Sequence, residues 1–122
     1  MSAAILTVDD SASIRVAIRI ALSGAGYTVA EASNGKEGVD KANAGAFDLI
    51  VSDLNMPVMN GLEMVEALRR IPAHAGVPII MLTTESDVDV KARAKAAGAT
   101  GWITKPFDPE QLVRIVKKVL GR

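Results

Sequence analysis

The sequence contains no cysteine and only one histidine. Without cysteine, the chain can form neither a disulfide nor a thiolate metal site, and it cannot use a thiol as a catalytic nucleophile. This composition fits a protein of a reducing compartment.

A net charge is also missing. Fourteen lysines and arginines balance fourteen aspartates and glutamates, and the basic residues form no continuous run. Proteins that bind nucleic acids or anionic membranes usually carry a basic patch. We therefore expect neither a nucleic acid nor a membrane as a partner.

Long apolar runs are absent as well. No stretch reaches the roughly 18 consecutive apolar residues that a membrane-spanning helix needs. The first ten residues, MSAAILTVDD, lack a basic residue and meet two acids before any apolar stretch as long as a signal peptide requires. We expect a soluble, cytoplasmic protein.

The chain does contain two alternating patterns over its 122 residues, of which 49% are apolar and 23% are charged. This length and composition indicate one globular domain over residues 1–122, with no output domain. Five runs rich in Ile, Val and Leu show little alternation of polarity, which is typical of strands in a buried parallel sheet. The predicted strands are Ala4–Val8, Thr28–Ala32, Phe47–Ser52, Pro78–Leu82 and Thr100–Thr104.

Apolar residues at helical spacing occupy the segments between these runs, as in Ile14, Ile18 and Leu22. The segment from Asp87 to Ala97 lacks a clean apolar stripe, so we expect its helix to pack lightly and to be a part that moves. Cap residues support the helix boundaries. The predicted N-caps are Asn34, Asn60 and Asp108, and the predicted C-terminal caps are Gly24, Gly45 and Gly98.

Five βα units joined by right-handed crossovers predict an α/β fold, a doubly wound five-stranded parallel sheet with helices on both faces. A barrel would need eight such units. The second predicted strand is followed directly by Ser33 and Asn34, and not by an acid or a lysine. We therefore expect it at an edge of the sheet, away from the functional residues.

Polar residues directly follow four of the predicted strands. They are Asp9-Asp10, Asp53, Thr83-Thr84 and Lys105-Pro106. Each alone is compatible with an ordinary turn or helix cap. Because the carboxyl ends of parallel strands meet at one edge of a sheet, the whole set indicates a shared functional crevice.

Three carboxylates in one crevice would repel one another at separations of about 4–6 Å, so Asp9, Asp10 and Asp53 call for a cation. Only hard oxygen ligands are available there, without histidine or cysteine nearby in the sequence. Such ligands favour Mg²⁺, with Mn²⁺ as a substitute.

Four motifs resemble those of the receiver domain of two-component response regulators, and the resemblance extends over the whole chain. The motifs are VDDS at Val8–Ser11, SDLNMPVMNG at Ser52–Gly61, LTTES at Leu82–Ser86 and GWITKPF at Gly101–Phe107. Stand-alone chemotaxis receivers of the CheY type are the most similar members. The resemblance implies a flavodoxin-like (βα)5 sheet with strand order 2-1-3-4-5.

The resemblance also implies site roles. Asp10 and Asp53 would bind Mg²⁺ directly, Asn55 through its backbone carbonyl, and Asp9 largely through water. Asp53 would accept a phosphoryl group from a phosphohistidine, while Lys105 would neutralise charge on it.

The switch residues follow from the same resemblance. Thr83 would donate its hydroxyl to the bound phosphoryl group, and Trp102 would move in response. Asn55 and Glu85 match positions that tune water attack on the acyl phosphate. The face formed by the fourth helix, fifth strand and fifth helix, with Lys91, Trp102 and Lys105 near it, would report the switch.

The protein would then be a monomeric signalling phosphoprotein that catalyses its own phosphorylation and dephosphorylation. Its expected partners are a histidine kinase as phosphodonor, a target such as a flagellar switch component, and a phosphatase.

Pro57 and Gly61 would shape the loop behind Asp53, Gly61 either by permitting close approach or by adopting an unusual backbone angle. Ordinary loop punctuation is the alternative explanation for both. The methionines Met56, Met59 and Met64 are expected to fill gaps around the third helix.

Three alternative functions share part of this pattern. A flavodoxin-like nucleotide binder shares the topology, but Asp9-Asp10 would repel a phosphate after the first strand. An aspartyl phosphatase carries a second aspartate two residues after its nucleophile, where this chain has Asn55. A phosphate sink or phosphorelay intermediate stays open, because its site would be identical and only its partner would differ.

Overall fold

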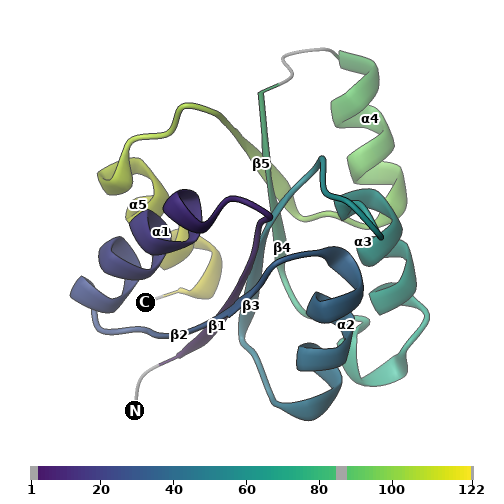
Figure 1. Ribbon diagram of the computed structural model, residues 1–122, viewed down its shortest axis with the longest axis horizontal. Helices are drawn as coiled ribbons and strands as arrows, with labels where there is room; N and C mark the ends of the chain where they lie inside the picture. The colour runs from purple at the N-terminus through teal and green to yellow at the C-terminus, as the bar shows by residue number, and fades with distance from the viewer. Residues whose placement is uncertain (1–2, 85–87, 122) are drawn as a thin grey trace.

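The computed structural model describes residues 3–84 and 88–121, in which strands and helices alternate along the chain (Figure 1). The strands are β1 (Ala4–Val8), β2 (Thr28–Ala32), β3 (Leu49–Asp53), β4 (Ile79–Thr83) and β5 (Gly101–Thr104). The helices are α1 (Ala12–Gly24), α2 (Gly35–Ala44), α3 (Gly61–Arg69), α4 (Val88–Ala97) and α5 (Pro109–Leu120), with a short 3-10 turn η1 (Pro72–His74).

The five strands form one parallel sheet in the order β2-β1-β3-β4-β5. This order confirms the predicted doubly wound, flavodoxin-like sheet and places β2 at an edge, as expected. The carboxyl ends of β1, β3 and β4 therefore adjoin, and all five residues of β3 and of β4 are buried.

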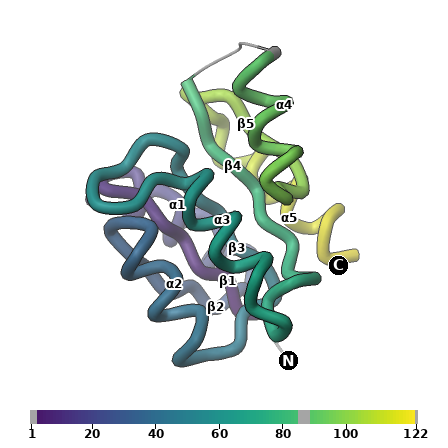
Figure 2. The backbone as a smooth tube through the Cα atoms, turned by 90° about the vertical axis from the view of Figure 1, so that its right-hand side faces the viewer, coloured from purple at the N-terminus to yellow at the C-terminus, as the bar shows by residue number. Residues whose placement is uncertain are grey.

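Two helical layers cover the sheet, with α1 and α5 on one face and α2, α3 and α4 on the other (Figures 1 and 2). Each layer packs its apolar side chains onto the strands and forms its own core. The α1/α5 core contains Ile5, Ile18, Leu22, Leu49, Val51, Ile80, Leu82, Ile103, Leu112 and Val116. The opposite core contains Leu6, Val8, Ile50, Met64, Val65, Leu68, Ile79 and Met81, with Met56 and Met59 packed against it. The three methionines thus fill space around α3, as predicted.

The predicted bounds of β1 and β2 are confirmed, whereas those of β3, β4 and β5 differ from prediction by one or two residues. The third strand begins at Leu49 and includes Asp53. Asp48 lies just before β3, where its N–H donates to the Ala4 carbonyl (2.7 Å) and its carboxylate accepts from the Ala4 N–H (2.8 Å). These two bonds join Asp48 to the first residue of β1, which also pairs with Thr28 of β2.

The predicted N-caps are confirmed. The side chains of Asn34, Asn60 and Asp108 accept hydrogen bonds from backbone N–H groups in the first turns of α2, α3 and α5. Each side chain satisfies a donor that the helix itself leaves unpaired.

Among the predicted C-caps, Gly45 and Gly98 are confirmed, whereas Gly24 is wrong. Helix α1 continues through Gly24, and Gly26 adopts the left-handed angle (φ 97°). The Tyr27 N–H donates to Leu22 and the Gly26 N–H to Ser23, which is the Schellman arrangement. Gly26 fits that turn because it lacks a Cβ.

Helix α4 is joined to the body mainly at its C-terminal end. Among its described side chains, only Ala94 is fully buried, which agrees with the predicted light packing; Asp87 lies outside the described residues. The Arg69 guanidinium of α3 donates to the Gly98 carbonyl through Nε (3.0 Å) and Nη2 (2.8 Å), and to the His74 carbonyl through Nη1 (2.8 Å). Arg69 thus ties three elements together.

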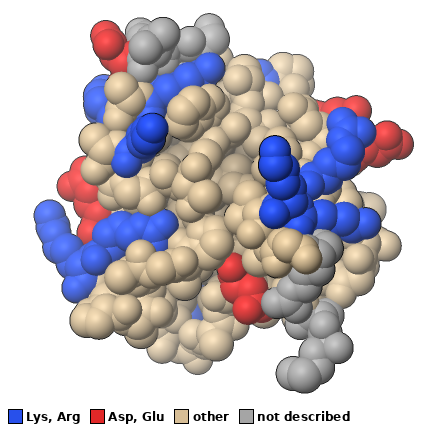
Figure 3. Space-filling model, turned by 180° about the vertical axis from the view of Figure 1, so that it is seen from behind, with Lys and Arg blue, Asp and Glu red and all other residues tan. Residues whose placement is uncertain are grey.

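Lysines and arginines lie in separate groups on the face shown in Figure 3, with uncharged surface between them. None of the helices in the described ranges combines the length and apolarity needed to cross a membrane.

Candidate functional site

The carboxylates of Asp9, Asp10 and Asp53 form one cluster, in which an oxygen of each residue lies within 4.8 Å of the others. Asp9 directly follows β1 and Asp53 ends β3, so adjacent strands bring the two together. Asp9 is 1% exposed and Asp53 is 8% exposed, whereas Asp10 is open to solvent. The cluster therefore combines two buried acids with one accessible acid.

Backbone donors hold the two buried carboxylates. Asp9 Oδ1 accepts from the Ser11 N–H (2.9 Å), and Asp53 Oδ1 accepts from the Leu54 N–H (2.9 Å). The Asp9 N–H in turn donates to the Ala32 carbonyl of β2 (3.0 Å). These bonds fix both side chains relative to the sheet.

Lys105 supplies the positive charge of the site. Its Nζ lies 3.1 Å from Asp53 Oδ1 and 3.3 Å from Asp9 Oδ2, and its side chain is 16% exposed. The Lys105 N–H donates to the Thr83 carbonyl (2.7 Å), which places the residue directly after β5 beside the end of β4.

Burial and charge shift two pKa values in the site. Burial raises the pKa of Asp9, and the nearby Asp53 charge adds to this, while the Ser11 N–H and Lys105 oppose it in part. Burial alone would lower the pKa of Lys105, but its hydrogen bond to Asp53 and the charges of Asp53 and Asp9 outweigh burial and raise it. The raised pKa of Lys105 favours its protonated form, whereas the raised pKa of Asp9 means that its surroundings disfavour the charged carboxylate.

The donor set fits Mg²⁺. Three carboxylates converge within 4.8 Å, and their oxygens are the ligand type that this ion prefers. Lys105 provides one positive charge against three negative ones, so a divalent cation would relieve the remaining repulsion. Asn55 follows two residues after Asp53 and is exposed.

The predicted switch residues lie on neighbouring strands. Thr83 ends β4 and is buried at 3% exposure. Trp102 lies on β5, is 38% exposed, and has Lys91 Nζ of α4 at 5.6 Å from its ring centroid. Lys105 directly follows β5, and its ammonium contacts Asp9 and Asp53 of the acidic cluster. Glu85 lies outside the described residues.

The loop behind Asp53 depends on Gly61. A Cβ at Gly61 would lie 2.3 Å from the Asp53 carbonyl and 2.5 Å from Met81 Cε. Of the two roles considered for Gly61, close approach is therefore the one present.

Sequence reasoning missed the unusual backbone of Val58 in that loop. Val58 has a left-handed angle (φ 68°), and the Met59 N–H donates across it to the Pro57 carbonyl (2.7 Å). This is a strained γ-turn, and β-branched residues rarely adopt it. Nothing in the residue type of Val58 signals such a turn.

Sequence reasoning also missed a polar group beside Asp9. Arg15 of α1 donates from Nη1 to the Asp9 carbonyl and pairs with Glu31 of β2. Glu31 is the acid that both Arg15 and Arg19 contact. The available signal was two arginines at i and i+4 on a helix without acids.

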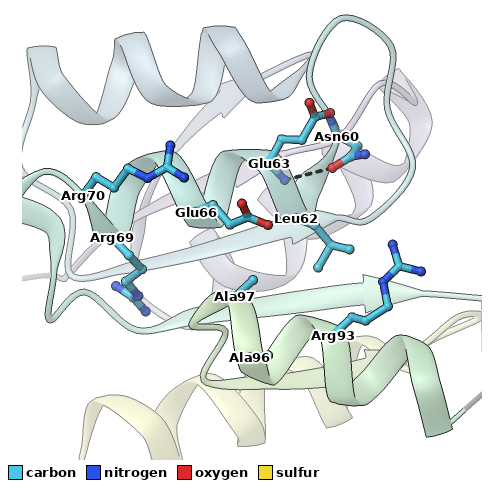
Figure 4. Close-up of a pocket in the computed structure, with 9 residues that line it drawn as sticks. All are labelled: Asn60, Leu62, Glu63, Glu66, Arg69, Arg70, Arg93, Ala96 and Ala97. Carbon is cyan, nitrogen blue, oxygen red and sulfur yellow. Dashed lines mark hydrogen bonds between the residues drawn. The ribbon is translucent and has the colours of Figure 1, made fainter.

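A groove of about 620 Å³ lies between α3 and α4, away from the acidic cluster (Figure 4). Leu62 and Glu66 of α3 face α4 there, and Arg93 forms part of the other wall. A smaller apolar cavity of about 430 Å³ adjoins Lys105 and Thr84. Neither of these two cavities is lined by Asp9, Asp10 or Asp53, so cavity volume does not identify the acidic cluster as the functional site.

Residues 5–117 match the family model of the response regulator receiver domain, and the chain belongs to this family. The fold and the acidic cluster are thus those of a two-component signalling protein.

Particular relatives include chemotaxis proteins. The chain is 40% identical to chemotaxis protein CheY1 of Helicobacter pylori, with 96% of each chain covered. It is 47% identical to the structure of chemotaxis response regulator CheY4 of Vibrio cholerae, with a TM-score of 0.94 over 98% of this chain and 99% of that one.

Other relatives are longer. The chain is 41% identical to the phosphate regulon transcriptional regulatory protein PhoB of Pseudomonas aeruginosa, with 97% of this chain and 52% of PhoB covered. It also covers 58% of the probable transcriptional regulator ycf29 of Porphyra purpurea, so it spans little more than half of these two relatives. The receiver domain of sensor histidine kinase PA1611 of P. aeruginosa, solved with magnesium in its active site cleft, is 28% identical with a TM-score of 0.92 and full coverage of both chains.

Proposed function

We propose that this protein is a phosphoacceptor response regulator, in which Asp53 takes a phosphoryl group from the phosphohistidine of a histidine kinase. The observation that carries the proposal is the bridging position of Lys105, whose Nζ contacts both Asp53 and Asp9 inside a cluster of three carboxylates. The three carboxylates can bind a cation, and the Lys105 ammonium can stabilise negative charge on a phosphoryl group placed beside them.

Asp53 is the proposed nucleophile because it is the acid that Lys105 contacts most closely. A carboxylate oxygen of Asp53 attacks the phosphorus, the phosphorus–nitrogen bond of the phosphohistidine breaks, and the histidine nitrogen keeps the electron pair. The Leu54 N–H holds Oδ1 of the same carboxylate, which orients the side chain during the attack.

Mg²⁺ bound by Asp10, Asp53 and the Asn55 carbonyl, with Asp9 contributing through water, would supply positive charge to the phosphoryl oxygens. Lys105 supplies a second positive charge, since its ammonium remains protonated beside two carboxylates. Asp9 keeps Lys105 in place through their 3.3 Å contact. The same residues would support hydrolysis of the acyl phosphate, which makes the signal transient.

The phosphoryl group adds roughly −1.5 to −2 charges next to Thr83. The Thr83 hydroxyl would turn toward it and release space that Trp102 could enter from β5. Lys91 lies over the Trp102 ring in this structure, so movement of the ring would change the surface formed by α4, β5 and α5. That surface is the proposed contact for a partner such as a flagellar switch component.

A chemotaxis role is supported by similarity to CheY1 and CheY4 over nearly the full length of each. The phosphate sink or phosphorelay intermediate remains the second candidate, since it would use the same site. Phosphorylated protein would bind a switch component in the first case and only histidine-containing phosphotransfer domains in the second.

Labelling with acetyl phosphate in the presence of Mg²⁺ tests the proposal. Asp53→Asn should lose all acid-stable, base-labile label, because an amide is not a nucleophile for this step. Asp48→Asn is the matched control and should label like the parent, since Asp48 contacts Ala4 away from the cluster. Undiminished label in Asp53→Asn would refute the assignment.

A further inference from the structure

Arg15 is a basic residue that contacts the backbone of the acidic cluster. It lies in the second turn of α1, and its side chain reaches back toward the start of the helix, as helical side chains generally do. Its Nη1 donates to the Asp9 carbonyl, the peptide oxygen between the two sequential acids. Resting on the metal site proposed above, we propose that Arg15 is a positioning residue that orients the Asp9-Asp10 peptide for Mg²⁺ binding.

The turn from β1 to α1 has few other restraints on Asp10. Asp9 is held by its N–H on Ala32 and by its own side chain on the Ser11 N–H. In contrast, Asp10 is exposed, and no hydrogen bond or ion pair joins its side chain to another described residue. The direction of the Asp10 carboxylate therefore depends on its two flanking peptides, of which the Ser11 N–H bond to Asp9 holds one and Arg15 holds the other through the Asp9 carbonyl.

Glu31 fixes the position of Arg15. It projects from edge strand β2 on the side of α1, in register with Thr7. Its Oε1 pairs with Arg15 Nε (3.4 Å), and its Oε2 pairs with Arg19 Nη1 (2.8 Å). Arg15 therefore contacts two acceptors through different nitrogens of one rigid planar group, Nη1 at the Asp9 carbonyl and Nε at Glu31, a geometry that the single nitrogen of an ammonium does not reproduce.

Arg15 is not part of the hydrophobic core. Its side chain is 20% exposed and borders an open polar cavity of about 330 Å³ that Glu31, Ser33 and Glu37 also line. A substitution there leaves no void in the packed interior, so the fold should tolerate it.

Positioning and simple electrostatics predict opposite effects on metal affinity. If Arg15 acted only through its charge, its removal would strengthen cation binding, because one nearby positive charge would be lost. If it orients the Asp9-Asp10 peptide, its removal should weaken Mg²⁺ binding, as loss of supporting contacts around metal ligands commonly does. The sign of the change thus distinguishes the two.

The test is a calorimetric titration with Mg²⁺ of the parent, Arg15→Met and Arg19→Met. Arg15→Met should weaken binding by about tenfold. Arg19→Met is the matched control, because Arg19 also pairs with Glu31 but does not contact Asp9; it should bind Mg²⁺ as tightly as the parent or slightly more tightly. Arg15→Lys should fall between the parent and Arg15→Met.

Acetyl phosphate labelling adds a second readout. Arg15→Met should need more Mg²⁺ for half-maximal labelling, yet reach the parental rate at saturating Mg²⁺, because Asp53 and Lys105 remain in place. Equal or tighter Mg²⁺ binding by Arg15→Met would overturn the inference and leave the proposed function intact. Absence of Mg²⁺ binding by the parent would instead overturn the proposed function and this inference together. If circular dichroism showed that Arg15→Met does not fold, the Mg²⁺ affinity of Arg15→Lys would be compared with that of the parent instead. Weaker binding by Arg15→Lys would support the inference, and equal or tighter binding would overturn it.

Discussion

At the scale of single residues, the site holds charged side chains in buried positions, where loss of hydration disfavours the charged forms. Asp9 is almost fully buried next to Asp53, and Lys105 is the described side-chain cation that contacts both. One ammonium does not neutralise three carboxylates. The site is therefore arranged to bind a cation at a cost to the stability of the metal-free protein.

Asp9→Asn should stabilise the metal-free protein. Because burial raises the pKa of Asp9, its charged form weakens the fold above the raised pKa, and this cost disappears as pH falls through it. At neutral pH in a chelator, the variant should melt higher by about 3–6 °C, for a gain near 1 kcal/mol.

Scanning calorimetry over a range of pH values measures this. The advantage of Asp9→Asn should shrink as pH is lowered and also when Mg²⁺ is added to the parent. Asp40→Asn, at an exposed position on α2, serves as the control and should leave the melting temperature nearly unchanged. A lower melting temperature for Asp9→Asn in chelator would contradict the electrostatic account.

Thr7→Val should also stabilise the fold. Thr7 is fully buried in β1, and within the described part of the chain its Oγ1 has no hydrogen-bond partner. Replacing the hydroxyl by a methyl group removes an unsatisfied polar atom at nearly constant volume, with an expected gain of about 1 kcal/mol.

Urea unfolding should show this gain as a higher midpoint with an unchanged slope. Thr104→Val is the matched control, since Thr104 is exposed on β5 and its hydroxyl is solvated in either state. Loss of stability in Thr7→Val would mean that the hydroxyl has a partner after all.

At the scale of elements, the chain predicted what local patterns determine. Apolar runs such as AILTV located the strands, and side chains such as Asn34 located helix starts, because both depend on residues near in sequence. The end of α1 was misplaced at Gly24, since the sequence offers two nearby glycines for a Schellman turn and the left-handed angle occurs at Gly26. The start of β3 lies at Leu49 and not at Phe47, because its pairing with β1 begins at Ile5, which is distant in sequence.

Arg69→Met should loosen the C-terminal end of α4. The substitution removes three hydrogen bonds that tie the Gly98 and His74 carbonyls to α3. We expect a loss of about 1–3 kcal/mol and faster amide hydrogen exchange at Ala99, whose N–H donates to Ala94.

Arg70→Met provides the comparison, because Arg70 is the next residue on the chain, is exposed, and its side chain makes no hydrogen bond or ion pair with other residues in the described ranges. In Arg70→Met, the amide hydrogen of Ala99 should exchange at the same rate as in the parent. Equal exchange rates in both variants would show that Arg69 does not anchor α4.

At the scale of the whole molecule, the sheet gathers acids that the sequence placed after separate strands. Asp9, Asp10 and Asp53 could be predicted to meet because each lies at or just after the carboxyl end of a strand. Arg15 and Glu31 could not, because their contact depends on how α1 packs beside edge strand β2. The strain at Val58 was likewise invisible, since valine is no turn-forming residue.

Signal transmission across the sheet should depend on Thr83. Beryllofluoride with Mg²⁺, a mimic of the phosphoryl group, should change the fluorescence of Trp102, the single tryptophan. Thr83→Ala should still accept the phosphoryl group, because Asp53 and Lys105 remain, but should show a smaller fluorescence change.

Asp53→Asn is the negative control for that experiment and should show no change with beryllofluoride. A full fluorescence change in Thr83→Ala would refute the coupling between Thr83 and Trp102. The phosphorylation chemistry would be unaffected by that result.

The identity of the phosphorylated residue is the most direct test of the central claim. Borohydride reduces an aspartyl phosphate to homoserine, so the parent would be treated with acetyl phosphate and Mg²⁺, reduced, digested and analysed by mass spectrometry. The account predicts homoserine at position 53 alone, and none when a chelator replaces Mg²⁺. Homoserine at another aspartate, or the same yield at position 53 without Mg²⁺, would contradict it.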